Sequence, residues 1–313
     1  NLAGAATAIV SGGPGAIFWM WISAFFGMAT IFAEAVLAQL FKKEVNGHVT
    51  GGPAYYLRYG LNSKFLSSFF AVTIVLALGF IGNMVQANSI GTAFESAFHI
   101  SPLIVGIVLA IISGFIFVGG VARIASFTEK IVPIMAGFYI LGGIIILVMM
   151  GSSTLDAIRQ VFVGAFNPSA VLGGAAGITV KNAIRYGVSR GLFSNEAGMG
   201  SVPNAAAAAD TSHPAKQGFV QALGVYVDTW LVCTATSFII LLGGEDFYGE
   251  AGGKGLEITQ QALVHEVGNW GVPFLSLCVF FFAFSSIIGN YFYGESNIGF
   301  LGGNKTVLNI FRA

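Results

Sequence analysis

Residues 191–210 read GLFSNEAGMGSVPNAAAAAD, and they interrupt what is otherwise an apolar, helix-forming part of the chain. The stretch contains the pair Asn195-Glu196, three glycines and Pro203. In hydrocarbon an unpaired backbone group costs several kcal/mol, so irregular backbone is tolerated only where it is buried in protein or lines a cavity. The interruption therefore predicts a functional site within a membrane-crossing helix.

The composition of the chain is that of an integral membrane protein. Charged residues make up 9% of its 313 residues, hydrophobic residues make up 55%, and the mean hydropathy is +0.80. A typical soluble domain has roughly 25% charged residues. We therefore expect an all-α integral membrane protein in which residues 1–313 form a single transmembrane domain.

Apolar runs of the length needed to cross a bilayer, about 17 to 25 residues, recur along the chain. Six continuous spans are predicted, at residues 14–41, 65–94, 102–119, 131–150, 219–242 and 272–292. The interrupted segment, residues 171–209, is predicted to supply a seventh. Because the chain begins without Met in an apolar stretch and ends at Ala313 after a polar linker, we expect a fragment with helices missing on both sides.

Lysine and arginine collect on one set of alternate loops. If loop 42–64 is cytoplasmic, nine of these residues lie on the cytoplasmic side and two, Arg159 and Lys254, lie on the other. Cytoplasmic loops carry an excess of Lys and Arg, so we expect loop 42–64 to be cytoplasmic and the protein to lie in the inner or plasma membrane of a cell. The formal net charge of +0 gives no reason to expect nucleic acid as a partner.

Enzymatic and metal-site patterns are not found in the sequence. The four histidines are scattered over loops, whereas structural zinc needs closely spaced ligands. The sequence contains no phosphate-binding loop, HExxH, GxSxG or pair of carboxylates on one helical face. Cys233 and Cys278 lie in apolar runs, where we expect free thiols. The chain is therefore expected to be neither an enzyme nor a cofactor protein.

The glycine-rich turn after Asn195 is expected to expose backbone amides at the start of the next half-helix. Alternation of the loops makes this half-helix run from mid-membrane to the cytoplasm, so its positive dipole end suits a carboxylate. The unwound carbonyls and the side chains of Ser194 and Asn195 suit an ammonium group or a cation.

A second break of this kind is predicted at the start of the chain. Residues 1–4, NLAG, match residues 195–198, NEAG, at three of four positions, although chance similarity is the alternative in a chain with 43 glycines. Opposed discontinuous helices that meet at the midplane hold substrate and coupling ion in inverted-repeat transporters.

Four motifs carry a resemblance to a known family: GLFSNEAGMGSVPNAAAAA from Gly191, TGGPAYYLRYGL from Thr50, GGPGAIFWMW from Gly12 and GNMVQANSI from Gly82. They resemble the alanine or glycine:cation symporter family over essentially the whole chain. The resemblance implies a LeuT-type inverted-repeat transporter bundle with discontinuous helices, of which residues 1–313 cover the later half of the first core helix through the eighth. It also implies sodium-driven uptake of a small neutral amino acid by alternating access.

The resemblance also implies residues that contact the substrate. Those at the breaks are Asn1, Ser194, Asn195 and the amides around Ala197 and Gly198. Gln86 matches a polar residue that faces the substrate, and an interhelical hydrogen bond is its alternative role. Phe193 resembles the aromatic residue that covers the pocket, and lipid contact or core packing is its alternative.

Ser285 and Ser286 resemble the hydroxyl ligands of a sodium site between the first and eighth core helices. Hard cations such as sodium prefer oxygen ligands. The alternative is donation of the hydroxyls to the preceding helical turn, the commoner use of serine in apolar helices. The residues that follow, 289–291, depart from a Trp-containing form in some members of the family, which bears on the size of the pocket.

Charged residues within the spans have to be explained, because each costs about 2.5 to 3.5 kcal/mol at the middle of a helix. Glu196 is expected to cap the half-helix, and Glu34 and Asp228 are expected to face the bundle near the ends of their spans. Proton coupling through Glu196 or Asp228 is the first alternative to sodium coupling. A channel and an intramembrane enzyme are the remaining alternatives. The expected partners are sodium, a small neutral amino acid such as alanine or glycine, and the lipid bilayer.

Overall fold

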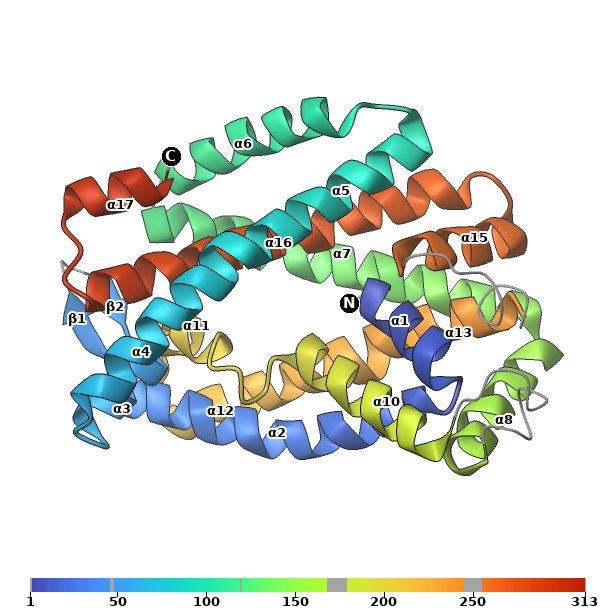
Figure 1. The fold of residues 1–313 in the computed structure, drawn as a ribbon, viewed down its shortest axis with the longest axis horizontal. Helices are drawn as coiled ribbons and strands as arrows, with labels where there is room; N and C mark the ends of the chain where they lie inside the picture. The colour runs from blue at the N-terminus through green and yellow to red at the C-terminus, as the bar shows by residue number, and fades with distance from the viewer. Residues whose placement is uncertain (1, 46–47, 119, 168–178, 245–254, 313) are drawn as a thin grey trace. The chain divides into compact units, whose positions relative to one another are not determined.

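The computed structural model describes residues 2–45, 48–118, 120–167, 179–244 and 255–312, which fold mostly as helices (Figure 1). The helices are α1 (Leu2–Gly12), α2 (Ala16–Leu40), α3 (Pro53–Tyr59), α4 (Lys64–Ile74), the π-helix η1 (Val75–Gly82), α5 (Asn83–Phe98), α6 (Pro102–Val118), α7 (Gly120–Met150), α8 (Ser152–Phe166), α10 (Val180–Asn195), α11 (Val202–Ala208), α12 (Pro214–Val225), the π-helix η2 (Tyr226–Cys233), α13 (Thr234–Leu242), α15 (Leu256–Val267), α16 (Gly271–Phe300) and α17 (Lys305–Arg312). Loop 42–64 also carries an antiparallel hairpin of β1 (Lys43–Val45) and β2 (His48–Thr50), in which Lys43 is opposite Thr50. The expected helical class is confirmed, while the hairpin was not predicted.

Among the described residues, five helical stretches are long and apolar enough to cross a membrane. They are Ala16–Leu40, Lys64–Phe98, Ser126–Met149, Pro214–Leu242 and Gly271–Phe300. Each overlaps a continuous span predicted from the sequence. The remaining prediction, residues 102–119, corresponds to the 17-residue helix α6, which is at the short end of the range that spans a bilayer.

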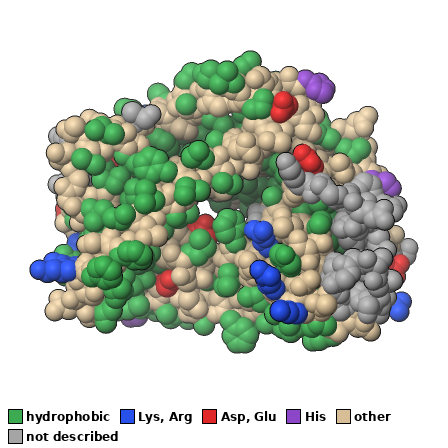
Figure 2. Space-filling model, viewed as in Figure 1, with side chains coloured by type: hydrophobic (Ala, Val, Ile, Leu, Met, Phe, Trp, Pro, Cys, Tyr) green, Lys and Arg blue, Asp and Glu red, His purple; other side chains and the backbone are tan. Residues whose placement is uncertain are grey.

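Large apolar side chains are exposed on these helices. Phe69 of α4 is 62% exposed, Ile81 of η1 is 62% exposed and Leu103 of α6 is 73% exposed. Figure 2 shows hydrophobic side chains over much of the face in view. Such a surface would be unfavourable in water, whereas it matches the hydrocarbon of a bilayer, so the chain is a multi-pass membrane protein.

The contacts divide the chain into two compact units, which are described one at a time. Unit 1 consists of Asn1–Met28, Met135–Asn195 and Leu223–Cys278. Within it, α1 packs against α10, α13 and α15. Helix α10 approaches the first part of α2 closely, because a Cβ atom at Gly187 would lie 2.2 Å from the Ala16 carbonyl oxygen and one at Gly191 would lie 2.1 Å from Ser23 Oγ. This small-residue spacing is typical of tight helix packing in membranes.

Unit 2 consists of Ala29–Ile134, Glu196–Ala222 and Val279–Ala313. Within it, α3 packs on α4, α5 packs on α6, and α11 packs on β2. The short helix α11 is held at its end by Gln39 of α2, whose Nε2 donates to the carbonyl oxygens of Ala206 at 2.5 Å and Ala209 at 2.8 Å. These carbonyls have no partner within a helix that ends at Ala208, so Gln39 supplies the missing donor.

Helix α16 continues eight residues beyond the predicted end at residue 292, through a polar sequence, to Phe300. Two of its polar side chains have partners elsewhere in unit 2: Asn297 Nδ2 lies 2.9 Å from Asn204 Oδ1, and Ser296 Oγ lies 2.6 Å from Thr50 Oγ1. The helix predicted from hydropathy therefore ended too early, because hydropathy contains no information about hydrogen bonds to distant residues.

Candidate functional site

The predicted interruption is present in the structure. Helix α10 ends at Asn195 and α11 begins at Val202. Between them the backbone takes positive φ angles, 56° at Glu196, 88° at Gly198 and 78° at Gly200. Glycine adopts such angles without the cost that a side chain imposes, so the sequence GMG is what allows the chain to turn here.

The α10 side of the break carries a carboxylate contact within unit 1. Ser194 Oγ donates a hydrogen bond of 2.5 Å to Oδ2 of Asp228, and it also lies 3.1 Å from Cys233 Sγ. Thr229 Oγ1 donates to the same carboxylate oxygen at 3.2 Å. Asp228 and Thr229 belong to η2, so the hydroxyl of Ser194 links the end of α10 to this π-helix.

Asp228 was expected near the end of its span, and this expectation was wrong. The helical stretch runs from Pro214 to Leu242, a length of 29 residues, and Asp228 is its central residue. The predicted span began at residue 219 because polar residues at positions 214–218 lower the hydropathy there. The helix includes these residues, but Asp228 is the tenth of 24 residues even in the predicted span 219–242, so it is an interior residue with either boundary.

The α11 side of the break carries a second carboxylate contact, within unit 2. The backbone amide of Gly198 donates to Oε2 of Glu34 at 3.1 Å, and the amide of Met199 donates to the carbonyl oxygen of Glu196 at 3.0 Å. The sequence predicted amides available to a substrate carboxylate around Ala197 and Gly198. In this structure the Gly198 amide already has a carboxylate partner from α2, and Ala197 is buried.

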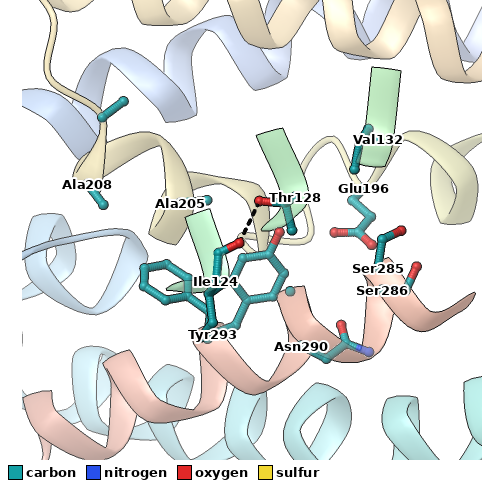
Figure 3. A pocket seen from close by; sticks show the side chains of 13 residues that line it. Ile124, Thr128, Val132, Glu196, Ala205, Ala208, Ser285, Ser286, Asn290 and Tyr293 are labelled. Carbon is teal, nitrogen blue, oxygen red and sulfur yellow. Dashed lines mark hydrogen bonds between the residues drawn. The ribbon is translucent and has the colours of Figure 1, made fainter. Parts of the chain in front are cut away.

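A cavity of about 520 Å³ lies within unit 2, beside the start of α11. Its lining residues are Ile124, Thr128, Val132, Glu196, Ala205, Ala208, Ala209, Ser285, Ser286, Gly289, Asn290, Phe292 and Tyr293. Figure 3 shows the Glu196 carboxylate directed toward the part of the cavity that Ser285 and Ser286 line. The Glu196 carboxylate also accepts a hydrogen bond from the hydroxyl of Ser201.

The serine and threonine hydroxyls that line this cavity donate hydrogen bonds to carbonyl oxygens of their own helices. Ser285 Oγ and Ser286 Oγ donate to the carbonyl oxygen of Phe282 at 2.9 and 3.0 Å, and Thr128 Oγ1 donates to that of Ile124 at 3.0 Å. The back-bonding predicted as the alternative for the two serines is therefore present. It does not prevent a role as ligands, because a hydroxyl that has donated its proton presents only lone pairs to an occupant of the cavity.

The other predicted site residues are more dispersed. Asn195 is buried, with 6% exposure, and Phe193 on the same helix is 56% exposed. Gln86 is half-buried on α5 and is not among the residues that line the unit 2 cavity. Asn1 lies outside the described residues.

Sequence analysis missed the contacts of Asp228 and Glu34 with the break. The signal for both was present, since each is an acidic residue in an apolar run, and ionisable residues within membrane spans mark functional positions. The described residues include no group of three or more His, Cys, Asp or Glu side chains that could hold a metal ion. Cys233 and Cys278 are free, as predicted.

Discontinuous helices such as α10 and α11 are a feature of membrane transport proteins, and the chain is a multi-pass helical membrane protein. The chain belongs to the sodium:alanine symporter family, whose model matches residues 1–313. The family resemblance inferred from the four sequence motifs is thereby confirmed.

Curated relatives match the chain over nearly all of its residues. It is 47% identical over 312 residues to the amino-acid carrier protein AlsT of Bacillus subtilis, a match that covers 100% of the chain and 65% of AlsT. It is 47% identical over 315 residues to the probable sodium/glutamine symporter GlnT of B. subtilis, covering 100% of the chain and 64% of GlnT. It is 44% identical over 313 residues to the sodium/alanine symporter AgcS of Methanococcus maripaludis, covering 98% of the chain and 68% of AgcS. The chain thus spans about two thirds of the length of these relatives.

Proposed function

We propose that the chain is part of a symporter that takes up a small neutral amino acid, alanine or glycine, together with sodium. Membership of the sodium:alanine symporter family is the observation that carries this proposal. The names of AgcS and GlnT, a sodium/alanine symporter and a probable sodium/glutamine symporter, agree with sodium as the coupling ion and an amino acid as substrate. The function proposed is transport, not catalysis.

The proposal includes a LeuT-type inverted-repeat bundle that works by alternating access. The broken helix supports it, because discontinuous helices in such transporters present backbone groups to the substrate. The proposed substrate contacts are those implied by the family resemblance: Asn1, Gln86, Phe193, Ser194, Asn195, Ala197 and Gly198. For Gly198 to bind a substrate carboxylate through its amide, the contact with Glu34 has to open.

Sodium is proposed to bind at Ser285 and Ser286. Both hydroxyls donate their hydrogen to the carbonyl oxygen of Phe282, so they offer lone pairs, which favour a cation over an anion in the unit 2 cavity. The carboxylate of Glu196 in the same lining adds negative charge. If sodium binding favours the substrate-ready form of the protein, the two affinities are linked reciprocally, by about 1 to 3 kcal/mol or roughly 5- to 150-fold.

The test is transport by the full-length protein in liposomes. We expect an inward sodium gradient to drive accumulation of labelled alanine, and removal of sodium to weaken alanine binding by roughly 5- to 150-fold. Replacing Ser285 and Ser286 together by alanine should remove this dependence more than it lowers the sodium-free affinity. Uptake at full rate from a proton gradient in sodium-free buffer would instead establish proton coupling.

Loop 42–64 is proposed to lie in the cytoplasm, with the protein in the inner or plasma membrane. The asymmetry of Lys and Arg between alternate loops supports this orientation. A cysteine introduced at Lys216 should be protected from an impermeant thiol reagent added to intact cells, whereas one at Asp156 should react. Since Cys233 and Cys278 are buried, the native thiols provide a low background. The reverse labelling pattern would invert the topology.

A further inference from the structure

Asp228 places a carboxylate at the centre of a helix that is long and apolar enough to cross a membrane. The span Pro214–Leu242 is 29 residues long, and 67% of its most apolar window is buried inside the protein. A charged side chain at the middle of a transmembrane helix costs about 2.5 to 3.5 kcal/mol even on insertion scales. A carboxylate is retained at such a position when another group interacts with its charge.

The partners of Asp228 are hydroxyl groups. Ser194 Oγ and Thr229 Oγ1 donate to its Oδ2 at 2.5 and 3.2 Å. Two hydroxyl donors orient the carboxylate, but they bring no positive charge. Both act on Oδ2, so neither of these hydrogen bonds uses Oδ1.

Within the described residues, no cation forms an ion pair with Asp228. The ion pairs found there join His265 to Glu266 and Arg312 to Glu295. Arg190 lies one helical turn before Ser194 on α10, yet no nitrogen of its guanidinium lies within the 4.0 Å of an ion pair with Asp228. Asp228 is half-buried, and the counter-charge that favours a carboxylate within an apolar helix is not supplied by these parts of the protein.

The local backbone sets Asp228 apart from an ordinary helical position. It is the third residue of the eight-residue π-helix η2, Tyr226–Cys233. π-Helical turns are uncommon and occur frequently at functional sites. In unit 1, η2 packs directly on α10, the helix whose last residues, Ser194 and Asn195, are proposed to contact the substrate.

We propose that Asp228 binds the ammonium group of the transported amino acid. This inference rests on the proposed function. It assigns a partner to the ammonium group of the substrate, because none of the substrate contacts proposed above is a charged side chain. An ammonium group offers three N–H donors and a full positive charge, which are the two things that the Ser194–Asp228–Thr229 contact lacks. The sodium ion is assigned to Ser285 and Ser286 in unit 2.

The experiment compares alanine with lactate, in which a hydroxyl replaces the ammonium group while the carboxylate and methyl group remain. Binding of both to the full-length protein is measured at fixed sodium, for the wild type and for Asp228→Asn. A charge-assisted hydrogen bond contributes about 10- to 100-fold in affinity, so we expect alanine binding to weaken by that factor in the variant. Lactate binding should change less than about twofold, so the preference for alanine over lactate should collapse.

Asp156→Asn is the matched control, because Asp156 is an exposed acid on α8 of the same unit; it should leave both affinities unchanged. An unchanged alanine affinity in Asp228→Asn would overturn the assignment, as would a loss of sodium affinity with the alanine preference intact. Equal weakening of alanine and lactate together with a lower melting temperature would make Asp228 a structural residue and overturn it too. Recovery of alanine binding in the double variant Asp228→Asn, Arg190→Gln would show that Asp228 forms an internal ion pair with Arg190, and this would also overturn the assignment.

Failure of the proposed function gives a different result. If the wild-type protein binds no alanine at any sodium concentration, both the symporter proposal and the role of Asp228 are overturned. If the wild type binds alanine in a sodium-dependent way and Asp228→Asn does so equally well, only the role of Asp228 is overturned.

Discussion

The two sides of the helix break differ in how their polar groups are satisfied. On the α11 side, the Gly198 amide donates to Glu34, Ser201 donates to Glu196, and the fully buried Asn204 is hydrogen-bonded to Asn297. On the α10 side, Asp228 has hydroxyl donors and no ion pair within the described residues. The α11 side thus carries two carboxylates, Glu34 and Glu196, and the α10 side carries one, Asp228; of the three, Glu34 accepts from a backbone amide of the break.

The difference predicts different effects on stability and on the choice between ligands, although Ala197, Gly198 and the sodium ligands of unit 2 are also proposed to take part in binding. Hydrogen bonds between buried polar groups fix a specific arrangement, whereas a charge that is partly removed from water is costly without a counter-charge. We therefore expect changes on the α11 side to lower stability while the choice of ligand stays the same. Changes on the α10 side should alter which ligand binds.

The largest effect is expected at Gly200. A Cβ atom there would lie 2.8 Å from Phe70 Cε2 and Pro53 Cγ at a φ of +78°, whereas a Cβ at Gly198, with a φ of +88°, would meet its nearest neighbour, Thr30 Cγ2, at 3.7 Å. Gly198→Ala should therefore lower the free energy of unfolding by about 1 to 2 kcal/mol, through backbone strain alone. Gly200→Ala should lower it by about 1 to 3 kcal/mol more, because the added Cβ atom overpacks against Phe70 and Pro53.

Thermal unfolding of the full-length protein in detergent measures both glycine variants. Equal losses of stability in the two variants would mean that Phe70 and Pro53 rearrange to accommodate the added Cβ atom. The α11 side of the break would then be less rigid than its contacts indicate.

A smaller effect is expected at Asn204. Its Nδ2 donates to the carbonyl oxygens of Gly200 and Ser201, both at 2.9 Å, and its Oδ1 accepts from Asn297. Asn204→Leu removes these three side-chain hydrogen bonds, and although Ser201 O keeps the Asn204 backbone amide and Asn297 Nδ2 keeps the Tyr293 carbonyl, the loss should cost about 1 to 3 kcal/mol in the free energy of unfolding. The ratio of alanine to lactate affinity should stay at its wild-type value. A collapse of that ratio would show that the α11 side also selects the ligand, and the comparison of the two sides would fail.

The smallest effect is expected at Glu34. Glu34→Leu removes the acceptor of the partly exposed Gly198 amide and should lower stability by about 0.5 to 1.5 kcal/mol. Glu34→Gln keeps an acceptor oxygen and should recover most of this loss. Glu95→Leu is the control, since Glu95 is exposed on α5 of the same unit. If Glu34→Gln changes the affinity for alanine more than it changes the melting temperature, the charge of Glu34 serves binding as well as structure.

Predictions made from the sequence succeeded where one local property decides the structure. The spans follow from hydropathy, and the break follows from Glu196 and the glycines at 198 and 200, which interrupt an apolar run. Predictions that depend on a partner far along the chain did less well. The amide of Gly198 was expected to be available, but its acceptor, Glu34, is 164 residues away in sequence. The last turns of α16 were missed because Asn297 and Ser296 are stabilised by Asn204 and Thr50.

The sequence by itself determined that this is a helical membrane protein of the sodium:alanine symporter family with a helix interrupted at residues 196–201. In hydrocarbon the backbone has to satisfy its own hydrogen bonds, so an apolar composition is sufficient to predict helices and a short polar, glycine-rich motif is sufficient to predict their interruption. Only the tertiary structure decided which polar groups meet at the break. Glu34 contacts the amide of Gly198, and Asp228, at the centre of its span, contacts the hydroxyl of Ser194. Hydrogen bonds depend on distances of about 3 Å between atoms of different helices, and the order of residues along one helix does not specify them.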